Sequence, residues 1–262
     1  MGYELSTLTS VAIDAAMEAG DILRKGFGTS FEITHKPGVQ NLVTEFDLAS
    51  ELCIIEKLKH YFPKHGFLAE ESGSSHNQDA EILWIIDPLD GTTNFAHDIP
   101  VFSISIGAKG RDGMLCGVIY QPITQELFVA EKGQGAFLNG SKIQVSSTAQ
   151  FVGGVGATGF PRNVHENPMG CVDHFVRILK SGTIIRNLGS TTINIAYVAA
   201  GRFDAYWALS LYPWDVAAGV LLVEEAGGQV TTYQGDPYAV LSGLPLVATN
   251  KTVHKEVLGF LS

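Results

Sequence analysis

Two aspartates separated by two residues end an apolar run in the string WIIDPLDGTTNF, residues 84–95. The run is typical of a buried strand that delivers Asp87 and Asp90 to a turn, and Gly91 lets the backbone of that turn approach a ligand closely. Thr92 follows as the expected start of a helix, whose free N–H groups bind phosphate oxygens. A bare Asp-Pro-x-Asp-Gly string is usually only a turn, but the nine residues DPLDGTTNF favour a metal ion and a phosphate held side by side.

Two further acidic residues, Glu70 and Asp215, stand at positions suited to the same site. Glu70 follows an apolar stretch and is expected at a strand end, a common place for ligand residues. Asp215 opens the helix predicted for PWDVAAG, where the helix dipole alone would favour an acid. Asp47, three residues after Thr44 in NLVTEFD, stands where it can cap a helix. Carboxylate oxygens without a neighbouring His or Cys cluster favour Mg²⁺ over zinc.

The composition limits the partners that the chain can have. Of its 262 residues 45% are apolar, enough for a sizeable core, and 17 basic against 27 acidic side chains give a net charge of −10. This charge opposes a general affinity for nucleic acid or for an anionic membrane, so neither is an expected partner. Three scattered cysteines make no disulfide framework, and the N-terminus lacks the basic start and continuous apolar run of a signal peptide. The expected location is the cytoplasm.

Two amphipathic helices are predicted near the N-terminus. The first places apolar residues at helical spacing over residues 5–23. After a short strand, FEIT, a capping box formed by Thr44 and Asp47 starts the second helix, which ends at Pro63. Its expected apolar stripe is Leu48, Leu52, Ile55, Leu58 and Phe62. The two helices should pair.

The remaining chain shows two different patterns of apolar and polar residues. Residues 82–145 form short apolar or alternating runs between turns, which predicts a mostly antiparallel sheet. After Gly153 the pattern becomes α/β. Helices are expected at 165–180, 191–200, 214–226 and 251–261, and strands around 183–187, 203–207, 229–232 and 245–249. We expect a single domain over residues 1–262, with an N-terminal half, 1–150, and a C-terminal half, 151–262, that share a cleft.

Four segments together resemble the inositol monophosphatase family. They are AEES at 69–72, DPLDGTTNF at 87–95, the Gly189-Ser190 turn, and WDVAAG followed by EAGG within 214–228. The resemblance runs from the first helix to the last. It implies an α/β (α+β) fold, the layered αβαβα sandwich of inositol monophosphatases and fructose-1,6-bisphosphatases. It also implies a lithium-sensitive phosphatase, inositol-1-monophosphatase-like, and a homodimer.

The resemblance also assigns metal ligands. Glu70, Asp87 and the Leu89 carbonyl should bind a first Mg²⁺. Asp87, Asp90 and Asp215 should bind a second, and Glu70 also touches a third; Mn²⁺ is an expected substitute. Two carboxylates ~4 Å apart repel by ~4 kcal/mol at an effective dielectric near 20. Two Mg²⁺ ions roughly cancel the four carboxylates and a third makes the site positive, which explains how an acidic protein attracts an anion.

The catalytic residues implied by the resemblance are Asp47, Thr92 and Glu70. Thr92 with Asp47 should orient and deprotonate a water that attacks the phosphorus in line, without a phosphoenzyme, while metal ions activate the water and stabilise the leaving alkoxide. The N–H groups of Gly91 and Thr92 should hold the phosphate. Lys36 matches a loop lysine near the family's site, although a solvated loop lysine is nearly as good an interpretation.

The substrate is expected to be a small phosphorylated polyol or sugar. The substrate-binding set implied by the resemblance is Lys36, Asp90, Gly91, Thr92, Arg186, Gly189, Ser190, Thr191, Ala208 and Asp215. Ala208 stands where inositol-hydrolysing relatives usually have a glutamate that accepts hydrogen bonds from the substrate's hydroxyls, which weakens a preference for inositol 1-phosphate. A broad phosphatase is therefore expected.

Two alternatives remain. Within the same family, the substrate could be fructose 1,6-bisphosphate or a nucleotide 2′-phosphate such as NADP. A different class of function is a non-catalytic, metal-regulated binding or scaffolding protein. The intact pair of Thr92 and Asp47 argues against this as the sole role, because a binding protein has no need to activate water.

Overall fold

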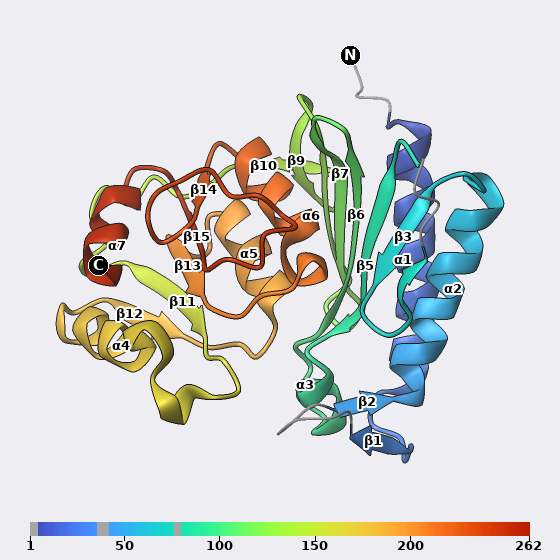
Figure 1. Cartoon of the computed structure of the whole chain (residues 1–262), viewed down its shortest axis with the longest axis horizontal. Helices are drawn as coiled ribbons and strands as arrows, with labels where there is room; N and C mark the ends of the chain where they lie inside the picture. Colours follow the sequence, from blue (N-terminus) through green and yellow to red (C-terminus); the bar gives the residue numbers. More distant parts are fainter. Residues whose placement is uncertain (1–4, 36–41, 76–79) are drawn as a thin grey trace.

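The computed structural model describes residues 5–35, 42–75 and 80–262. Five layers succeed one another across the molecule in Figure 1: the helix pair α1 and α2, an eight-stranded sheet, the helices α5 and α6, a five-stranded sheet, and the helices α4 and α7. The predicted αβαβα order is confirmed. Within the described ranges, no helix has the length and apolar character needed to cross a membrane.

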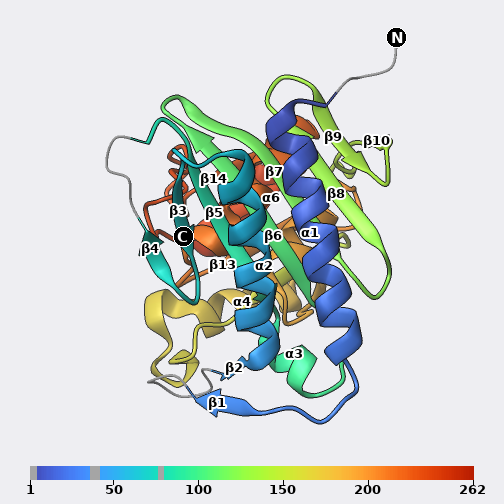
Figure 2. The ribbon, with the colours of Figure 1, turned by 90° about the vertical axis from the view of Figure 1, so that its right-hand side faces the viewer.

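The outer helices at the N-terminal end pair as expected. Helix α1 (Thr7–Gly26) starts at Ser6, whose hydroxyl accepts a hydrogen bond from the Thr9 N–H, and α2 (Glu45–Tyr61) starts at the predicted capping box of Thr44 and Asp47. Figure 2 shows the two helices side by side across one face of the large sheet.

The predicted apolar stripe of α2 is wrong at its first two positions. The Leu48 and Leu52 side chains are 55% and 58% exposed, while the inner face of this part of the helix carries Asp47, Ser50 and Glu51, all buried. The physical reason is that this stretch of α2 packs against polar segments at the strand ends, where its side chains find hydrogen-bond partners. Apart from Phe46 in the first turn, whose ring contacts Phe31 and Phe95, the buried apolar residues of α2 begin at Ile54.

The large sheet has the strand order β10-β9-β8-β7-β6-β5-β3-β4. Its pairs are antiparallel, as expected, except that β3 runs parallel to β5. The strands are β3 (Gly66–Ala69), β4 (Gly73–Ser75), β5 (Leu83–Asp90), β6 (Ser103–Gly110), β7 (Gly113–Gln121), β8 (Glu126–Glu131), β9 (Gly135–Leu138) and β10 (Ser141–Ile143). A separate pair joins β1 (Ile33–His35), close to the expected FEIT strand, to β2 (Leu42–Thr44).

Strand β5 continues through both aspartates of the motif, and its register shifts between them. Asp87 lies opposite Ser105 and Asp90 opposite Ser103, so three steps on β5 face two on β6. Residues three apart on a regular strand point to opposite faces, and one extra residue in a bulge corrects this. The bulge therefore allows both carboxylates to reach one side of the sheet. Helix α3 (Thr92–Ala96) follows, as predicted.

The second half builds the smaller sheet, of order β12-β11-β13-β15-β14. Its strands are β11 (Val155–Gly159), β12 (Ile184–Arg186), β13 (Ala205–Ala208), β14 (Gln229–Thr231) and β15 (Leu246–Thr249). Its helices are α4 (Cys171–Lys180), α5 (Thr191–Ala199), α6 (Pro213–Glu225) and α7 (His254–Leu261). Helix α4 starts later than predicted because residues 164–170 form two 3₁₀ turns, with positive φ at Met169 and Gly170.

Candidate metal centre and active site

A cavity of about 470 Å³ lies between the two halves of the chain. One side is formed by the ends of β3 and β5 and by the start of α3, and the other by residues 159–163, the end of β13 and the start of α6. Residues from before and after position 150 therefore line the same cavity.

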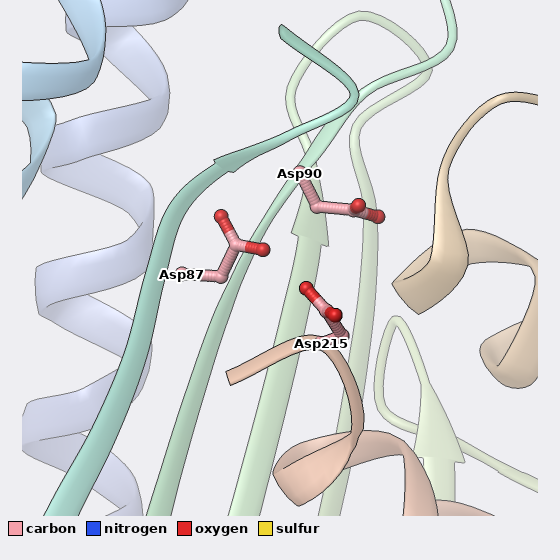
Figure 3. Close-up of side chains that lie close together, drawn as sticks. All are labelled: Asp87, Asp90 and Asp215. Carbon is pink, nitrogen blue, oxygen red and sulfur yellow. The ribbon is translucent and has the colours of Figure 1, made fainter. Parts of the chain in front are cut away.

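Three aspartates meet in this cavity. Asp87 and Asp90 come from β5 and Asp215 from the first turn of α6, and each offers one oxygen such that these oxygens all lie within 4.8 Å of one another. Figure 3 shows the three carboxylates gathered around a common space. Asp90 and Asp215 are 125 positions apart in the sequence, and the fold brings them into one acidic cluster.

Each of these carboxylates accepts a hydrogen bond from a backbone N–H group. Oδ1 of Asp87 accepts the Leu89 N–H at 3.0 Å, and Oδ2 of Asp215 accepts the Tyr212 N–H at 2.7 Å. Oδ2 of Asp90 accepts three hydrogen bonds, from the Ser190 hydroxyl and from the backbone and hydroxyl of Thr192. The backbone N–H of Thr191 also helps to hold Asp90. Each aspartate contributes one carboxylate oxygen to the shared space, where a cation could bind.

The charge balance of the cluster also calls for a cation. Burial raises the pKa of Asp87 well above its usual range, and the charges of Glu70, Asp90 and Asp215 raise it further. Burial and the neighbouring Asp90 likewise hold the pKa of Asp215 well above its usual range. Among the described residues that line the cavity, Arg162 is the one basic side chain. Hard oxygen donors at this spacing suit a divalent ion such as Mg²⁺.

Glu70 stands where the sequence predicts, directly after β3. Its N–H donates to the Ile86 carbonyl at 3.2 Å, which aligns it with β5. The residue lines the same cavity, and its charge raises the pKa of both Asp87 and Asp215. It is therefore a fourth carboxylate near the cluster but not a member of the close trio.

The expected pair of Thr92 and Asp47 is present. The Thr92 hydroxyl lies 3.0 Å from Oδ1 of Asp47 and 3.1 Å from the Leu89 carbonyl oxygen, both acceptors. Oδ2 of Asp47 accepts the backbone N–H of Thr44 at 2.8 Å and the Thr44 hydroxyl at 2.6 Å. One carboxylate thus caps α2 with one oxygen and faces Thr92 with the other. Burial raises the pKa of Asp47.

Two glycines let the backbone close around this corner. Gly91 has φ +96°, and a Cβ there would lie 3.1 Å from the Val101 carbonyl oxygen. Gly189 has φ +75°, and a Cβ there would lie 2.8 Å from the Asn94 side chain. Asn94 in turn donates to the Leu188 carbonyl at 2.8 Å. These contacts tie the start of α3 to the turn before α5, with the N-terminal backbone of α3 on the cavity wall.

The other sequence-predicted substrate residues divide into four groups. Gly189, Thr191 and Ala208 line the cavity. Ser190 is 1% exposed and donates to Asp90, so it supports the cluster from behind. Arg186 does not lie among the cavity-lining residues; its exposed side chain donates to the Ile185 carbonyl. Lys36 lies outside the described residues.

Two residues of the site had no sequence signal of their own. Thr192 holds Asp90 through two hydrogen bonds although 102 positions separate them. Arg162 enters the cavity from the irregular segment after β11, and its charge lowers the pKa of Asp215. Nothing in the local string GFPRN marks this arginine as part of a site.

Comparison with known proteins decides the family. The sequence model described as "Inositol monophosphatase family" matches residues 4–261. An inositol-1-monophosphatase of Caulobacter vibrioides is 38% identical over 249 residues, covering 94% of this chain and 97% of the relative. The Nus factor SuhB of Escherichia coli (strain K12) is 38% identical over 253 residues, covering 96% and 94%. The crystal structure of extragenic suppressor protein SuhB from Bartonella henselae superimposes with a TM-score of 0.93 at 36% identity, covering 98% of this chain and 99% of that one.

The chain belongs to the inositol monophosphatase family. The family resemblance and the αβαβα fold expected from the sequence are both confirmed. As a member of the inositol monophosphatase family, the protein is a phosphoric monoester hydrolase, and the cavity holds an acidic cluster that could bind a metal ion.

Proposed function

We propose that the protein hydrolyses small phosphate monoesters in a Mg²⁺-dependent reaction. The observation that carries this proposal is the trio Asp87, Asp90 and Asp215, each held by a backbone N–H group and each contributing a carboxylate oxygen to a shared space. Next to it lies a hydroxyl paired with a buried carboxylate, Thr92 with Asp47. A cation site beside a group that can activate water is what metal-assisted hydrolysis requires.

In the proposed site, Glu70, Asp87 and the Leu89 carbonyl hold one Mg²⁺, and the three aspartates hold another. Bound Mg²⁺ supplies charge for the phosphate and lowers the pKa of the attacking water. The backbone N–H groups of Gly91 and Thr92 bind phosphate oxygens. A third ion at Glu70, Mn²⁺ as a substitute and inhibition by lithium belong to the same proposal.

The chain's own proton acceptor in this proposal is Asp47. When the Thr92 hydroxyl donates to Oδ1 of Asp47, the Thr92 oxygen is left with lone pairs that accept a proton from the attacking water. The proton then passes through Thr92 to the Asp47 carboxylate. The raised pKa of Asp47 favours its acceptance.

Replacement of one carboxylate tests the metal site. Asp215→Asn keeps the size of the side chain but removes an anionic oxygen, so we expect activity in millimolar Mg²⁺ to fall at least about 100-fold, comparable to the loss of one electrostatic group in other active sites. Turnover of a chromogenic phosphate ester with Mg²⁺, and with a chelator instead, measures this. The exposed Asp236, changed to Asn, is the matched control and should keep full activity. Unchanged turnover by Asp215→Asn would refute the assignment of Asp215 as a metal ligand. If the unaltered protein hydrolyses no ester, the non-catalytic binding role is the remaining alternative.

The substrate class follows from the wall of the cavity opposite the carboxylates. Ala208 offers a methyl group there, and the guanidinium of Arg162 adds a positive charge. With Ala208 there is no carboxylate to accept hydrogen bonds from the hydroxyl groups of the substrate's alcohol part. The positive charge of Arg162 favours an alcohol part that carries a second negative group. We therefore infer a broad specificity that includes sugar and polyol phosphates, with fructose 1,6-bisphosphate and nucleotide 2′-phosphates as accepted substrates.

A substrate panel tests this inference. We expect kcat/KM for inositol 1-phosphate to lie within about tenfold of the best other ester, since a charged hydrogen bond worth ~1.5–3 kcal/mol is missing at Ala208. The panel comprises inositol 1-phosphate, fructose 1-phosphate, fructose 1,6-bisphosphate and a 2′-phosphonucleotide. A hundredfold preference for inositol 1-phosphate over every other ester would contradict the role given to Ala208.

The inferred assembly is a cytoplasmic homodimer. Exposed apolar side chains on α4 and β12 support self-association: Val172, Val176, Leu179 and Ile184.

A further inference from the structure

The first two turns of α2 present three buried polar side chains to the interior. Asp47, Ser50 and Glu51 are 1%, 0% and 4% exposed, whereas their helix neighbours Leu48 and Leu52 face solvent. Burying polar groups is unfavourable unless each finds a partner, so a helix that turns this face inward must gain specific contacts. Each of the three does.

The three side chains contact three different segments of the site. Asp47 accepts the Thr92 hydroxyl of α3, and the Ser50 hydroxyl donates to the Pro88 carbonyl of β5 at 2.7 Å. Glu51 accepts the backbone N–H groups of Glu71 and Ser72, both at 2.8 Å and each on a different carboxylate oxygen. One short stretch of helix is thus bonded to the three segments that carry Glu70, Asp87 and Thr92.

We propose that Glu51 is a positioning residue that sets the place of Glu70 for cation binding. Its carboxylate fixes the two residues that directly follow Glu70, while the Glu70 N–H is fixed by Ile86 on β5. The backbone on both sides of Glu70 is therefore held, and the direction of its side chain with it. This inference rests on the proposed role of Glu70 as a metal ligand.

The two-oxygen geometry explains why a carboxylate of this length is required. A glutamine would offer one acceptor oxygen, and its NH₂ group would face the second backbone N–H, donor against donor. An aspartate would be one methylene too short to reach both N–H groups from the same helix position. Outer residues that orient metal ligands commonly change metal affinity by about 10- to 100-fold when altered.

The test is Mg²⁺ binding by isothermal titration calorimetry on the full chain without substrate, so it does not depend on turnover. We expect Glu51→Gln to weaken the binding of Mg²⁺ about 10- to 100-fold while kcat at saturating Mg²⁺ recovers most of its value. Glu56→Gln, an exposed glutamate on the same helix, is the matched control and should bind as the unaltered chain does. The melting temperature in EDTA verifies that each variant is folded.

A double-variant comparison separates positioning from general support of the fold. Adding Glu51→Gln to Glu70→Gln should cause no further loss of Mg²⁺ affinity, because the group that Glu51 positions is already altered. Additive losses, or an unchanged affinity in the folded single variant, would overturn the proposal. If Glu51→Gln does not fold, Glu51→Asp replaces it with the same expected loss and the same overturning outcomes. A Glu70→Gln variant with normal Mg²⁺ affinity would instead count against the proposed metal site itself.

Discussion

The aspartates of the cavity are held in place by hydrogen bonds from neighbouring N–H and hydroxyl groups. Asp90 shows this most clearly, since one oxygen accepts from Ser190 and twice from Thr192. A carboxylate held by several donors on one side keeps the other oxygen in a fixed direction, so less ordering is needed when a cation binds. The site is preorganised at the level of single atoms.

Thr92 has two proposed roles, and removal of its hydroxyl isolates one of them. Thr92→Ala keeps the backbone N–H proposed to bind phosphate but removes the hydroxyl proposed to orient the attacking water. We expect kcat to fall about 100-fold or more, within the range of general acid–base assistance, while KM changes little. Steady-state kinetics in saturating Mg²⁺ measures both constants, with the exposed Thr252, changed to Ala, as the control. A raised KM with normal kcat would mean that Thr92 binds substrate and does not activate water.

The residues that the sequence revealed are those inside motifs. Asp87 and Asp90 could be recognised because they lie in one nine-residue string, and Glu70 and Asp215 because each stands at an element end within a family segment. Glu51 and Thr192 could not. Their importance depends on hydrogen bonds to residues 20 and 102 positions away, and a linear pattern contains no information on which backbone groups will be met.

Among the elements, α2 and β11 were hardest to predict for opposite reasons. The stripe of α2 was misplaced because its leucines obey helical spacing while the true inner face is polar. Strand β11, with the sequence VGATG, carries two glycines and shows no alternation, yet it lies between β12 and β13 and is held by ladder hydrogen bonds on both sides. Sheet position overrode weak local propensity.

A histidine network joins three elements of the second half. Nε2 of His254, at the start of α7, lies 2.9 Å from the Thr231 hydroxyl of β14, which itself donates to the Thr232 carbonyl. Nδ1 lies 2.8 Å from the Thr249 hydroxyl of β15, which also accepts the Lys251 N–H. All these bonds are satisfied by a neutral ring protonated at Nε2, a tautomer assigned from its partners. Burial lowers the pKa of His254.

This network predicts a loss of stability in mild acid. A lowered pKa means that the unfolded chain takes up the proton first, so the contribution of His254 is complete above the usual value of 6.5 and is lost as pH falls toward the folded-state pKa. The difference in unfolding free energy between the unaltered chain and His254→Gln should therefore shrink from pH 7.5 to pH 5. Urea denaturation at several pH values measures it, with the exposed His60→Gln as control. A difference that stays constant with pH would contradict this account.

For the whole molecule, the order of layers came from the resemblance and not from periodicity. Helical and strand spacing located most elements, but spacing does not say that α5 and α6 lie between two sheets. The reason lies in their composition: seven of the nine residues of α5 and eight of the thirteen of α6 are buried, so neither has a solvent face of ordinary width. Helices apolar on nearly every side must be covered on both.

The two walls of the cavity come from different parts of the sequence. Glu70, Asp87, Asp90 and Thr92 precede residue 151, whereas segments 159–163 and 206–212, which face them, follow it. In the proposed function, the reacting groups and the groups that meet the alcohol part of an ester thus come from separate stretches of the chain, and Asp215 is the exception, a proposed metal ligand from the second stretch. A chimaera carrying those two segments from a relative of different preference would keep its chemistry and exchange its choice of ester. In this architecture, substrate preference can therefore be changed without altering the proposed metal ligands that precede residue 151.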